Sequence, residues 1–375
     1  MIDTIKIRLP LKEVTQSISE KFHPVSLNDL QWSPKTHLST RYNPQKTVSF
    51  YSPTFIGEKY VINGVASYQL GIEVSLPKLL FGNNVEELPA DKDTLGWILE
   101  ELRSEIYRHL SLKYDIEELL SSEVAKIHVG KNFIFDDPGA PLSIIETISK
   151  SKADRVYDNN KIKYENNGSA FKIHANNKDT IFYDKKKDIE QCLKSPKRAI
   201  DRTITYGVKD EETPIHSLLF DKSSGVLRLE VRLNNRRYIR QAFPSISDDL
   251  SLENVFCNAP IIPYLEREWQ KAISDVSLVQ LGRNDIRSSF EAIAARGDYG
   301  FSLRDSLAVA AALEIIDMSS LNYLRSLIEK YYAKDDWYRF RKKLFIPNYC
   351  RPSYFEKIEE ELRIYNPIKL QNNNQ

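Results

Sequence analysis

The sequence predicts an α+β protein, with an antiparallel sheet covered by helices on one face and a helical region at the carboxyl end. Up to about residue 245, several short stretches alternate apolar and polar residues, as half-buried strands do. Beyond residue 250, apolar residues recur every three or four positions, as they do in helices. We therefore expect a domain over residues 1–245 that carries the sheet and a helical accessory domain over residues 246–375.

The first strands are indicated by alternation and by turn residues. Residues 5–9 alternate isoleucine and leucine with lysine and arginine, and Pro10 closes the stretch. Residues 60–62 and 65–76 flank Asn63 and Gly64, a pair suited to a tight hairpin turn. The second arm of this hairpin places Glu73 on its polar face.

A helix and a third strand follow. From Asp93 to Leu110, leucines and isoleucines form one apolar stripe, which predicts a helix that covers one face of the sheet. Residues 124–129 form a strand with His128 on its polar face, and a short helix is expected around residues 143–149.

The last predicted strands surround a basic stretch. Residues 171–174 and 180–183 read as a hairpin, and the basic run that follows looks helical as far as Pro196. Residues 227–233 are the clearest strand, with leucines and Val231 on one face and Arg228, Glu230 and Arg232 on the other.

Helices are expected in the remainder of the chain. Ser302 and Asp305 resemble a capping box in front of an apolar stripe, and further helices fit residues 320–333 and 335–344.

Composition excludes some protein classes and leaves others open. The chain has 375 residues, 41% of them hydrophobic, which is enough for a large core. No stretch is long and apolar enough to span a membrane, and the start of the chain does not resemble a secretory signal. We expect a cytosolic protein without membrane association. The three cysteines are far apart and form neither a disulfide set nor a zinc knuckle.

The net charge of +1 does not by itself indicate a nucleic-acid partner, but two local patches do. Residues 185–206 contain seven basic residues against three acids, and residues 228–240 contain five arginines against Glu230. Each run alone would be ordinary for a solvated charged surface.

Three predicted strands each carry, on the polar face, one side chain that can bind a metal ion. These side chains are Glu73, His128 and Glu230. If these strands are neighbours, carboxylate and imidazole ligands could hold Mg²⁺ or Mn²⁺. The alternative is that each residue is a solvent-facing group paired with a lysine or arginine. The sequence alone leaves both interpretations open.

Tyr183 ends a strand and precedes Lys185, Lys186 and Lys187. A phenol with a pKa of about 10 needs nearby positive charge or a metal ion to act as a nucleophile, and these lysines could supply that charge. The chain contains 20 tyrosines, and pattern alone does not separate Tyr183 from the other candidates. These are Tyr157, Tyr164 and Tyr206.

Other catalytic patterns are absent from the sequence. It contains no phosphate-binding GxxxxGK[ST] loop, no GxGxxG, no HExxH and no GxSxG. Nucleotide hydrolysis, zinc proteolysis and esterase chemistry therefore lose support.

Several stretches together resemble the gene II and gene X type replication initiators of filamentous phages and related plasmids, and more distantly the rolling-circle plasmid initiators. The matching stretches are MIDTIKIRLP (1–10), VSLPKLLFGNNV (74–85), IFYDKK (181–186), LRLEVRL (227–233) and WYRFRKKL (337–344). They extend over nearly the whole chain.

The resemblance implies a ferredoxin-like (RRM-like) palm and a metal-dependent nickase and strand transferase that initiates rolling-circle replication. Such an enzyme cuts one strand of origin DNA and forms a 5′-phosphotyrosyl link, after which the 3′ hydroxyl primes synthesis. The resemblance implies Tyr183 as nucleophile, Lys185 as its cationic neighbour and Glu230 as a metal ligand. Where relatives have an Arg-Ile-Asp strand, this chain has His128 in place of the aspartate, and an imidazole is a softer ligand.

The expected partners are single-stranded or duplex origin DNA, a host helicase and a polymerase in the cytoplasm of a bacterial host. Basic residues expected to contact DNA are Lys186, Lys187, Arg228, Arg232, Arg236, Arg237, Arg339, Arg341 and Lys342. The helix over residues 335–344 also brings Trp337 and Tyr338 beside these cations, which suits base stacking or, equally, simple packing.

A second function remains open from the residues. The same basic patches would serve a non-catalytic origin-binding protein that represses or competes with replication. A structural protein would show no salt-dependent affinity for DNA at all.

Overall fold

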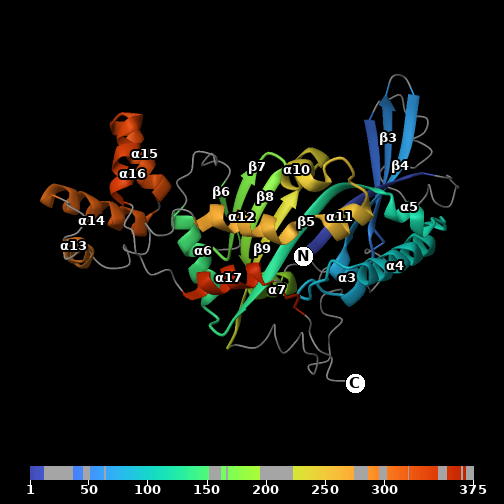
Figure 1. Cartoon of the computed structure of the whole chain (residues 1–375), viewed down its shortest axis with the longest axis horizontal. Coiled ribbons are helices and arrows are strands. Elements are labelled where there is room, and N and C mark those ends of the chain that lie inside the picture. Colours follow the sequence, from blue (N-terminus) through green and yellow to red (C-terminus); the bar gives the residue numbers. More distant parts are fainter. Residues whose placement is uncertain are drawn as a thin grey trace.

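A nine-stranded antiparallel sheet forms the centre of the protein (Figure 1). The computed structural model describes residues 1–11, 37–44, 51–62, 65–151, 162–165, 168–194, 223–273, 286–294, 302–319, 321–344, 353–364 and 366–368. The strand order is β2-β3-β4-β1-β5-β9-β8-β7-β6. The strands are β1 (Ile2–Pro10), β2 (His37–Tyr42), β3 (Thr54–Ile62), β4 (Val65–Ser75), β5 (Glu123–Phe135), β6 (Ile162–Glu165), β7 (Ala170–Ala175), β8 (Lys178–Asp184) and β9 (Gly225–Leu233). The expected α+β class is confirmed.

Helices occur between the strands and in the last part of the chain. They are α3 (Leu76–Phe81), α4 (Lys92–Leu110), α5 (Ile116–Leu120), α6 (Ala140–Ser151), α7 (Lys185–Lys194), α10 (Arg236–Ala242), α11 (Leu252–Asn258), α12 (Ile261–Ile273), α13 (Ile286–Ala294), α14 (Leu303–Met318), α15 (Leu321–Tyr331), α16 (Lys334–Leu344) and α17 (Ser353–Arg363).

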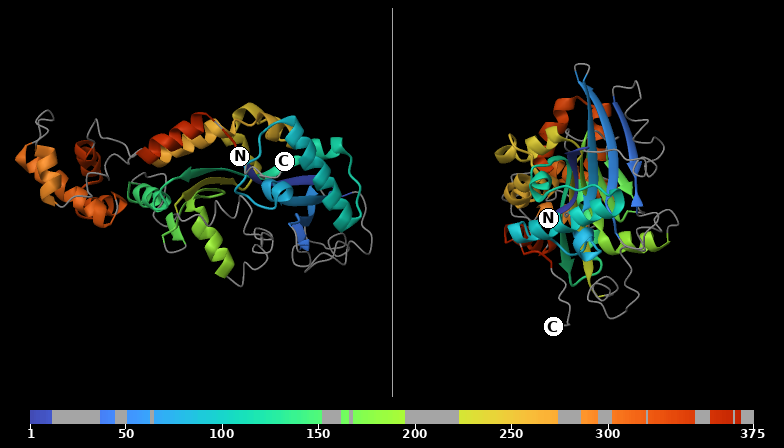
Figure 2. Two further views of the ribbon diagram at one scale, coloured as in Figure 1. Left: turned by 90° about the horizontal axis from the view of Figure 1, so that it is seen from below. Right: turned by 90° about the vertical axis from the view of Figure 1, so that its right-hand side faces the viewer.

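The two faces of the sheet are covered differently. Helices α10, α11, α12 and α17 lie on one face, whereas α7 lies on the other (Figure 2). We call these the helix face and the α7 face. Helix α12 packs with an apolar stripe that includes Leu265 and Trp269, both fully buried. Burial of this stripe fixes α12 against the sheet.

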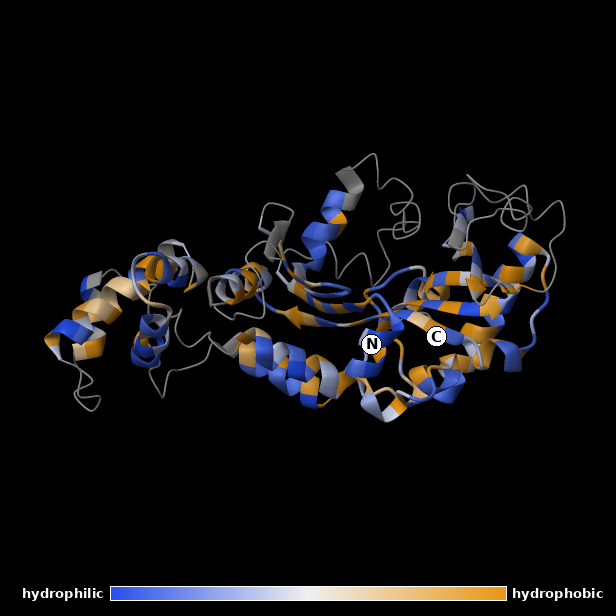
Figure 3. Ribbon diagram, turned by 90° about the horizontal axis from the view of Figure 1, so that it is seen from above, coloured by the Kyte–Doolittle hydropathy of each residue, from blue (hydrophilic) through white to orange (hydrophobic). Residues whose placement is uncertain are grey.

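Alternation along the strands assigns each residue to a face, as the hydropathy of the ribbon shows (Figure 3). In β9, the apolar residues Leu227, Leu229, Val231 and Leu233 are fully buried in the main core. Arg228, Glu230 and Arg232 therefore face the other way, toward α7. The strand predicted over residues 227–233 is confirmed.

Other elements also agree with their sequence patterns. The predicted helical stripe is helix α4, whose leucines and isoleucines are buried, and the Asp91 side chain caps it by accepting a hydrogen bond from the Thr94 N–H at 2.7 Å. The second hairpin arm ends at Ser75, because Leu76 and Pro77 begin α3. Strand β5 continues to Phe135, well beyond the stretch expected. The turn at Asn63 and Gly64 lies outside the described residues.

The hydrophobic cores do not divide at residue 245. Helices α11, α12 and α17 belong to the main core, through residues such as Leu252, Trp269 and Phe355. A second core joins α13, α14, α15 and α16, from Ile293 to Leu344, and α14 and α15 also contact α6. The helices of the expected accessory domain over residues 246–375 are therefore divided between two hydrophobic cores. The periodicity of a helix does not reveal which neighbour its apolar stripe contacts.

Trp337 belongs to this second core and is only 1% exposed. Of the two roles left open for the helix over residues 335–344, packing is therefore the one that this tryptophan performs. Tyr338, by contrast, is 37% exposed.

Among the described residues, no helix is both long enough and apolar enough to cross a membrane.

Candidate active site on the α7 face of the sheet

Three neighbouring strands bring Tyr183, Glu230 and His128 together on the α7 face. Strand β9 lies between β5 and β8, with Arg228 opposite Tyr183 and Arg232 opposite His128. The Tyr183 hydroxyl donates a hydrogen bond to Glu230 Oε2 at 3.1 Å. On the other side, His128 Nδ1 lies 3.6 Å from Glu230 Oε1. Glu230 is thus the centre of the cluster.

Two arginines hold the Glu230 carboxylate. Arg232 Nε donates to Oε1 at 2.7 Å, and Arg228 Nε lies 3.5 Å from Oε2. Burial alone would raise the pKa of Glu230, but the charges of Arg232 and Arg228 outweigh it and lower the pKa to about 2. The carboxylate is therefore ionised at any pH at which the protein is expected to work.

Arg228 is an interior residue. Its side chain is only 4% exposed, and Nη2 lies 2.7 Å from Asp3 Oδ2. Nη1 donates to the Asn132 side chain at 3.1 Å and to the Asn84 carbonyl at 3.0 Å. The expectation that Arg228 offers an exposed contact for DNA is thus corrected, because its guanidinium is occupied inside the protein.

Gly130 makes room for this arginine. A Cβ atom on Gly130 would lie 2.8 Å from the Leu229 carbonyl oxygen and 3.4 Å from Arg228 Nη2. The strand therefore needs a residue without a side chain where the guanidinium crosses from β9 toward Asp3 on β1.

His128 is a neutral imidazole with one unused nitrogen. Burial lowers its pKa to about 4, although Glu230 acts in the opposite direction. Its Nε2 atom is buried and has no hydrogen-bond partner in the described part of the chain. An unpaired ring nitrogen can bind a divalent cation, and Glu230 faces the other ring nitrogen, Nδ1.

Glu73 does not join this pair. It lies on β4, separated from β5 by β1, and its carboxylate contacts Lys126 Nζ at 2.8 Å and Arg41 Nη2 at 3.5 Å. Burial would raise the pKa of Glu73, but the hydrogen bond from Lys126 and the neighbouring charges lower it. Over the described ranges, no three acidic, histidine or cysteine side chains are grouped closely enough for a metal ion. The structure thus brings two of the three expected ligands together.

Tyr183 is held as a phenol. Burial and the negative charge of Glu230 raise its pKa well above the usual 10. Lys185 Nζ lies 5.6 Å from the centre of the tyrosine ring and 3.6 Å from Asp188 Oδ2. Burial lowers the pKa of this lysine. The lysine is therefore beside the ring, but burial and Glu230 keep the pKa of Tyr183 raised in the free protein.

The remaining basic candidates fall into two groups. Lys186 donates to the Ser224 carbonyl at 2.7 Å, Lys187 is half-buried, and Arg236 pairs with Glu123. The more accessible cations are Arg232 with a side chain 37% exposed, together with the exposed residues Arg237, Arg339 and Lys342, whereas Arg341 is half-buried.

The basic residues from Lys197 to Arg202 lie outside the described residues, as do Tyr157 and Tyr206. Of Tyr164 only the backbone, in β6, is described.

Comparison with known proteins adds no relative. Neither protein-family models, nor curated proteins, nor solved structures gave a match. The chemistry of the site therefore has to be argued from its own geometry.

Sequence reasoning missed two residues that shape this cluster, Asp3 and Asn132. Asp3 lies at a register irregularity between Ile2 and Thr4, which breaks the alternation of β1 and turns the acid toward Arg228. Asn132 lies in the part of β5 that was not predicted as strand. Their only sequence signal is that both are polar residues next to a strand pattern.

Proposed function

We propose that this chain is a metal-dependent nickase and strand transferase for single-stranded DNA that initiates rolling-circle replication, with Tyr183 as the nucleophile. The observation that carries the proposal is the hydrogen bond from the Tyr183 hydroxyl to Glu230, with the unpaired His128 Nε2 and the partly exposed Arg232 beside it. A nucleophile, a proton acceptor and a phosphate-binding cation are the groups that this reaction needs.

In the proposed reaction, the Tyr183 oxygen attacks phosphorus and the bond to the 3′ oxygen breaks. The phenolic proton passes to Glu230, and the departing 3′ oxygen takes a proton from water. The products are a 5′-phosphotyrosyl link and a free 3′ hydroxyl, which can prime a polymerase.

A phosphate at Arg232 would prepare this proton transfer. Arg232 and Arg228 are the charges that keep the pKa of Glu230 low. When a DNA phosphate draws Arg232 away from the carboxylate, Glu230 becomes a stronger base toward Tyr183. A divalent cation, Mg²⁺ or Mn²⁺ at His128 and Glu230, would supply further positive charge for the attacking oxygen and the phosphate.

We also propose a fold type for the sheet and a cellular setting for the reaction. An antiparallel sheet with helices on one face and polar chemistry on the other supports a ferredoxin-like (RRM-like) palm. The reaction would take place on origin DNA in a bacterial cytoplasm, together with a helicase and a polymerase of the host.

The test uses single-stranded DNA of randomised sequence with a label at its 3′ end, incubated with the full chain and Mn²⁺. Nicking transfers the labelled part to the protein, where it survives denaturation, and sequencing of the bound DNA reveals the recognised site. The adduct should be absent from Tyr183→Phe, which retains the ring. A labelled adduct in Tyr183→Phe would overturn the assignment of the nucleophile.

A non-catalytic origin-binding protein is the second candidate. It is favoured by the raised pKa of Tyr183 and by the separation of Glu73 from the other two expected ligands. Salt-dependent binding of DNA without any adduct, under the same conditions, would support this alternative and count against the nickase.

A further inference from the structure

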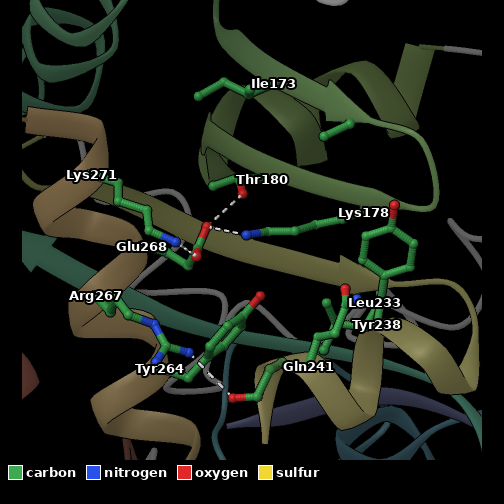
Figure 4. A pocket seen from close by; sticks show the side chains of 12 residues that line it. Ile173, Lys178, Thr180, Leu233, Tyr238, Gln241, Tyr264, Arg267, Glu268 and Lys271 are labelled. Atoms are coloured by element: carbon green, nitrogen blue, oxygen red, sulfur yellow. Dashed lines mark hydrogen bonds and ion pairs between the residues drawn. The ribbon is translucent and has the colours of Figure 1, made fainter. Parts of the chain in front are cut away.

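A pocket of about 630 Å³ opens on the helix face of the same strands that carry Tyr183 and Glu230 (Figure 4). It lies between the β7–β8 hairpin, the end of β9 and helices α10 and α12. Its volume falls in the range of small-molecule sites. It is distinct from the candidate active site, because Lys178 and Thr180 of β8 point to the helix face whereas Tyr183 points to the α7 face.

One end of the pocket is cationic. Arg267 and Lys271 come from α12, and Lys178 reaches in from β8 (Figure 4). Glu268 is the acidic member of the lining, and its side chain is only 1% exposed. Three cations against one carboxylate leave this end with a formal charge of +2.

The buried carboxylate positions the amines. Glu268 Oε2 accepts from Lys178 Nζ at 2.6 Å and from the Thr180 hydroxyl at 3.3 Å, and Oε1 accepts from Lys271 Nζ at 2.9 Å. Burial alone would raise the pKa of Glu268, but the positive charge of Lys178 outweighs burial, so the pKa of Glu268 is lowered. An ammonium group carries three N–H donors, and the hydrogen bond to Glu268 uses one of them in each lysine.

The other end is apolar and aromatic. Ile173 of β7 and Leu233 of β9 are buried on either side of β8, and the half-buried Tyr238 of α10 lies on the Leu233 side of the pocket (Figure 4). The ring of Tyr238 offers a surface on which a planar group can stack. Gln241 of α10 lies at the edge of this end and offers both a donor and an acceptor.

We propose that this pocket binds a nucleoside 5′-monophosphate, with the base at the Tyr238 end and the phosphate at the cations of α12. A purely structural ion network would account for Glu268 but not for an open cavity lined by cations on one side and an aromatic ring on the other. The same chemistry has two sources, a free nucleotide and the terminal nucleotide of a 5′-phosphorylated DNA strand.

The experiment measures binding of deoxyadenosine 5′-monophosphate to the full chain by calorimetry, with deoxyadenosine and inorganic phosphate as partial ligands. Lys271→Met should weaken binding of the monophosphate about tenfold, because a charge-assisted hydrogen bond is lost. The same variant should leave binding of deoxyadenosine unchanged. Tyr238→Ala should weaken the monophosphate and deoxyadenosine but not inorganic phosphate.

Arg103→Met is the matched control. Arg103 on α4 forms an ion pair with Glu100 three residues before it, as Lys271 does with Glu268. The two cations are similarly exposed, at 47% and 52%, whereas Glu100 is exposed and Glu268 is buried. This control should bind the monophosphate like the unaltered chain. Thermal unfolding of each variant shows whether the fold is intact.

A second arm replaces the free nucleotide by a 5′-phosphorylated decanucleotide and its unphosphorylated form. If Lys271→Met weakens binding of the phosphorylated decanucleotide but not of the unphosphorylated one, the ligand is the 5′ terminus of a strand. If neither the monophosphate nor the 5′ phosphate responds to Lys271→Met and Tyr238→Ala, the proposal is wrong. Adduct formation at Tyr183 is measured separately, so the two proposals succeed or fail independently.

Discussion

Tyr183 and Glu230 share a hydrogen bond of 3.1 Å between adjacent strands, although they are 47 positions apart in the chain. The contact connects a phenol whose pKa is raised to a carboxylate whose pKa is lowered to about 2. In the free protein, the proton therefore belongs to the tyrosine. Any reaction at Tyr183 must begin with a change in the charges around Glu230.

Glu230→Gln should reduce the phosphotyrosyl adduct at least about a hundredfold, because the proton acceptor is lost. It should also lower the free energy of unfolding by about 3 kcal/mol, since Arg228 and Arg232 lose a buried counter-charge. Urea denaturation measures the second effect. Glu100→Gln, which breaks an exposed pair, should cost less than about 1 kcal/mol. A wild-type level of adduct in Glu230→Gln would exclude the carboxylate as the base.

Arg228→Met and Arg232→Met should have opposite profiles. Arg228 is buried on Asp3, so its loss should destabilise the fold by about 3–5 kcal/mol. Loss of the more exposed Arg232 should affect stability less and DNA affinity more. The slope of the logarithm of affinity against the logarithm of salt concentration should fall by the amount expected for about one phosphate contact. DNA binding is compared at urea concentrations at which both variants are folded. Equal effects of the two variants on DNA affinity would contradict this difference in role.

His128 should make stability depend on pH between about 6.5 and 4. Burial lowers its folded pKa to about 4, so in this range the unfolded chain binds a proton that the folded chain does not. The free energy of unfolding should therefore fall as the pH decreases through this window, and be unaffected by His128 above it. His128→Gln should remove that part of the slope. An identical slope in the variant would show that other groups cause it.

Mn²⁺ binding, followed by the magnetic resonance signal of the free ion, distinguishes the expected ligands. His128→Gln should weaken Mn²⁺ binding at least about tenfold. In metal sites, loss of a residue that only hydrogen-bonds to a ligand already weakens affinity by about that much. Glu73→Gln should leave affinity within about twofold, since Lys126 and Arg41 hold that carboxylate on the far side of β1. A large loss in Glu73→Gln would mean that the metal recruits Glu73 on binding.

Gly130→Ala should destabilise the fold by about 1–3 kcal/mol and weaken the Arg228 network, because its Cβ would meet the Leu229 carbonyl oxygen at 2.8 Å. Gly96→Ala in helix α4 is the control. A Cβ there would have no neighbour within 4 Å, so the change should stabilise by about 0.5–1 kcal/mol through helix propensity. Chemical denaturation of both variants gives the comparison.

The sequence predicts which face each candidate occupies but not which strands are neighbours. Alternation is a local property, and it correctly places Glu230 and His128 on polar faces. Adjacency depends on pairing between distant segments, so the separation of Glu73 by β1 has no local signal. The burial of Arg228 is equally invisible, because its partner Asp3 is 225 residues away. For the same reason, the sequence does not show which core each helix after residue 245 joins, because the apolar stripe of a helix does not identify the element that it packs against.

Strand β9 also restricts how this chain can vary in length. Leu229 supports the main core, and the next residue, Glu230, holds the tyrosine, so inserting or deleting one residue in β9 would exchange the two surfaces for every residue beyond the change. Arginine and glutamate would enter the hydrophobic interior while leucines faced the cation cluster. A change in length within β9 is therefore expected to disrupt the hydrophobic core and the Tyr183–Glu230 cluster together.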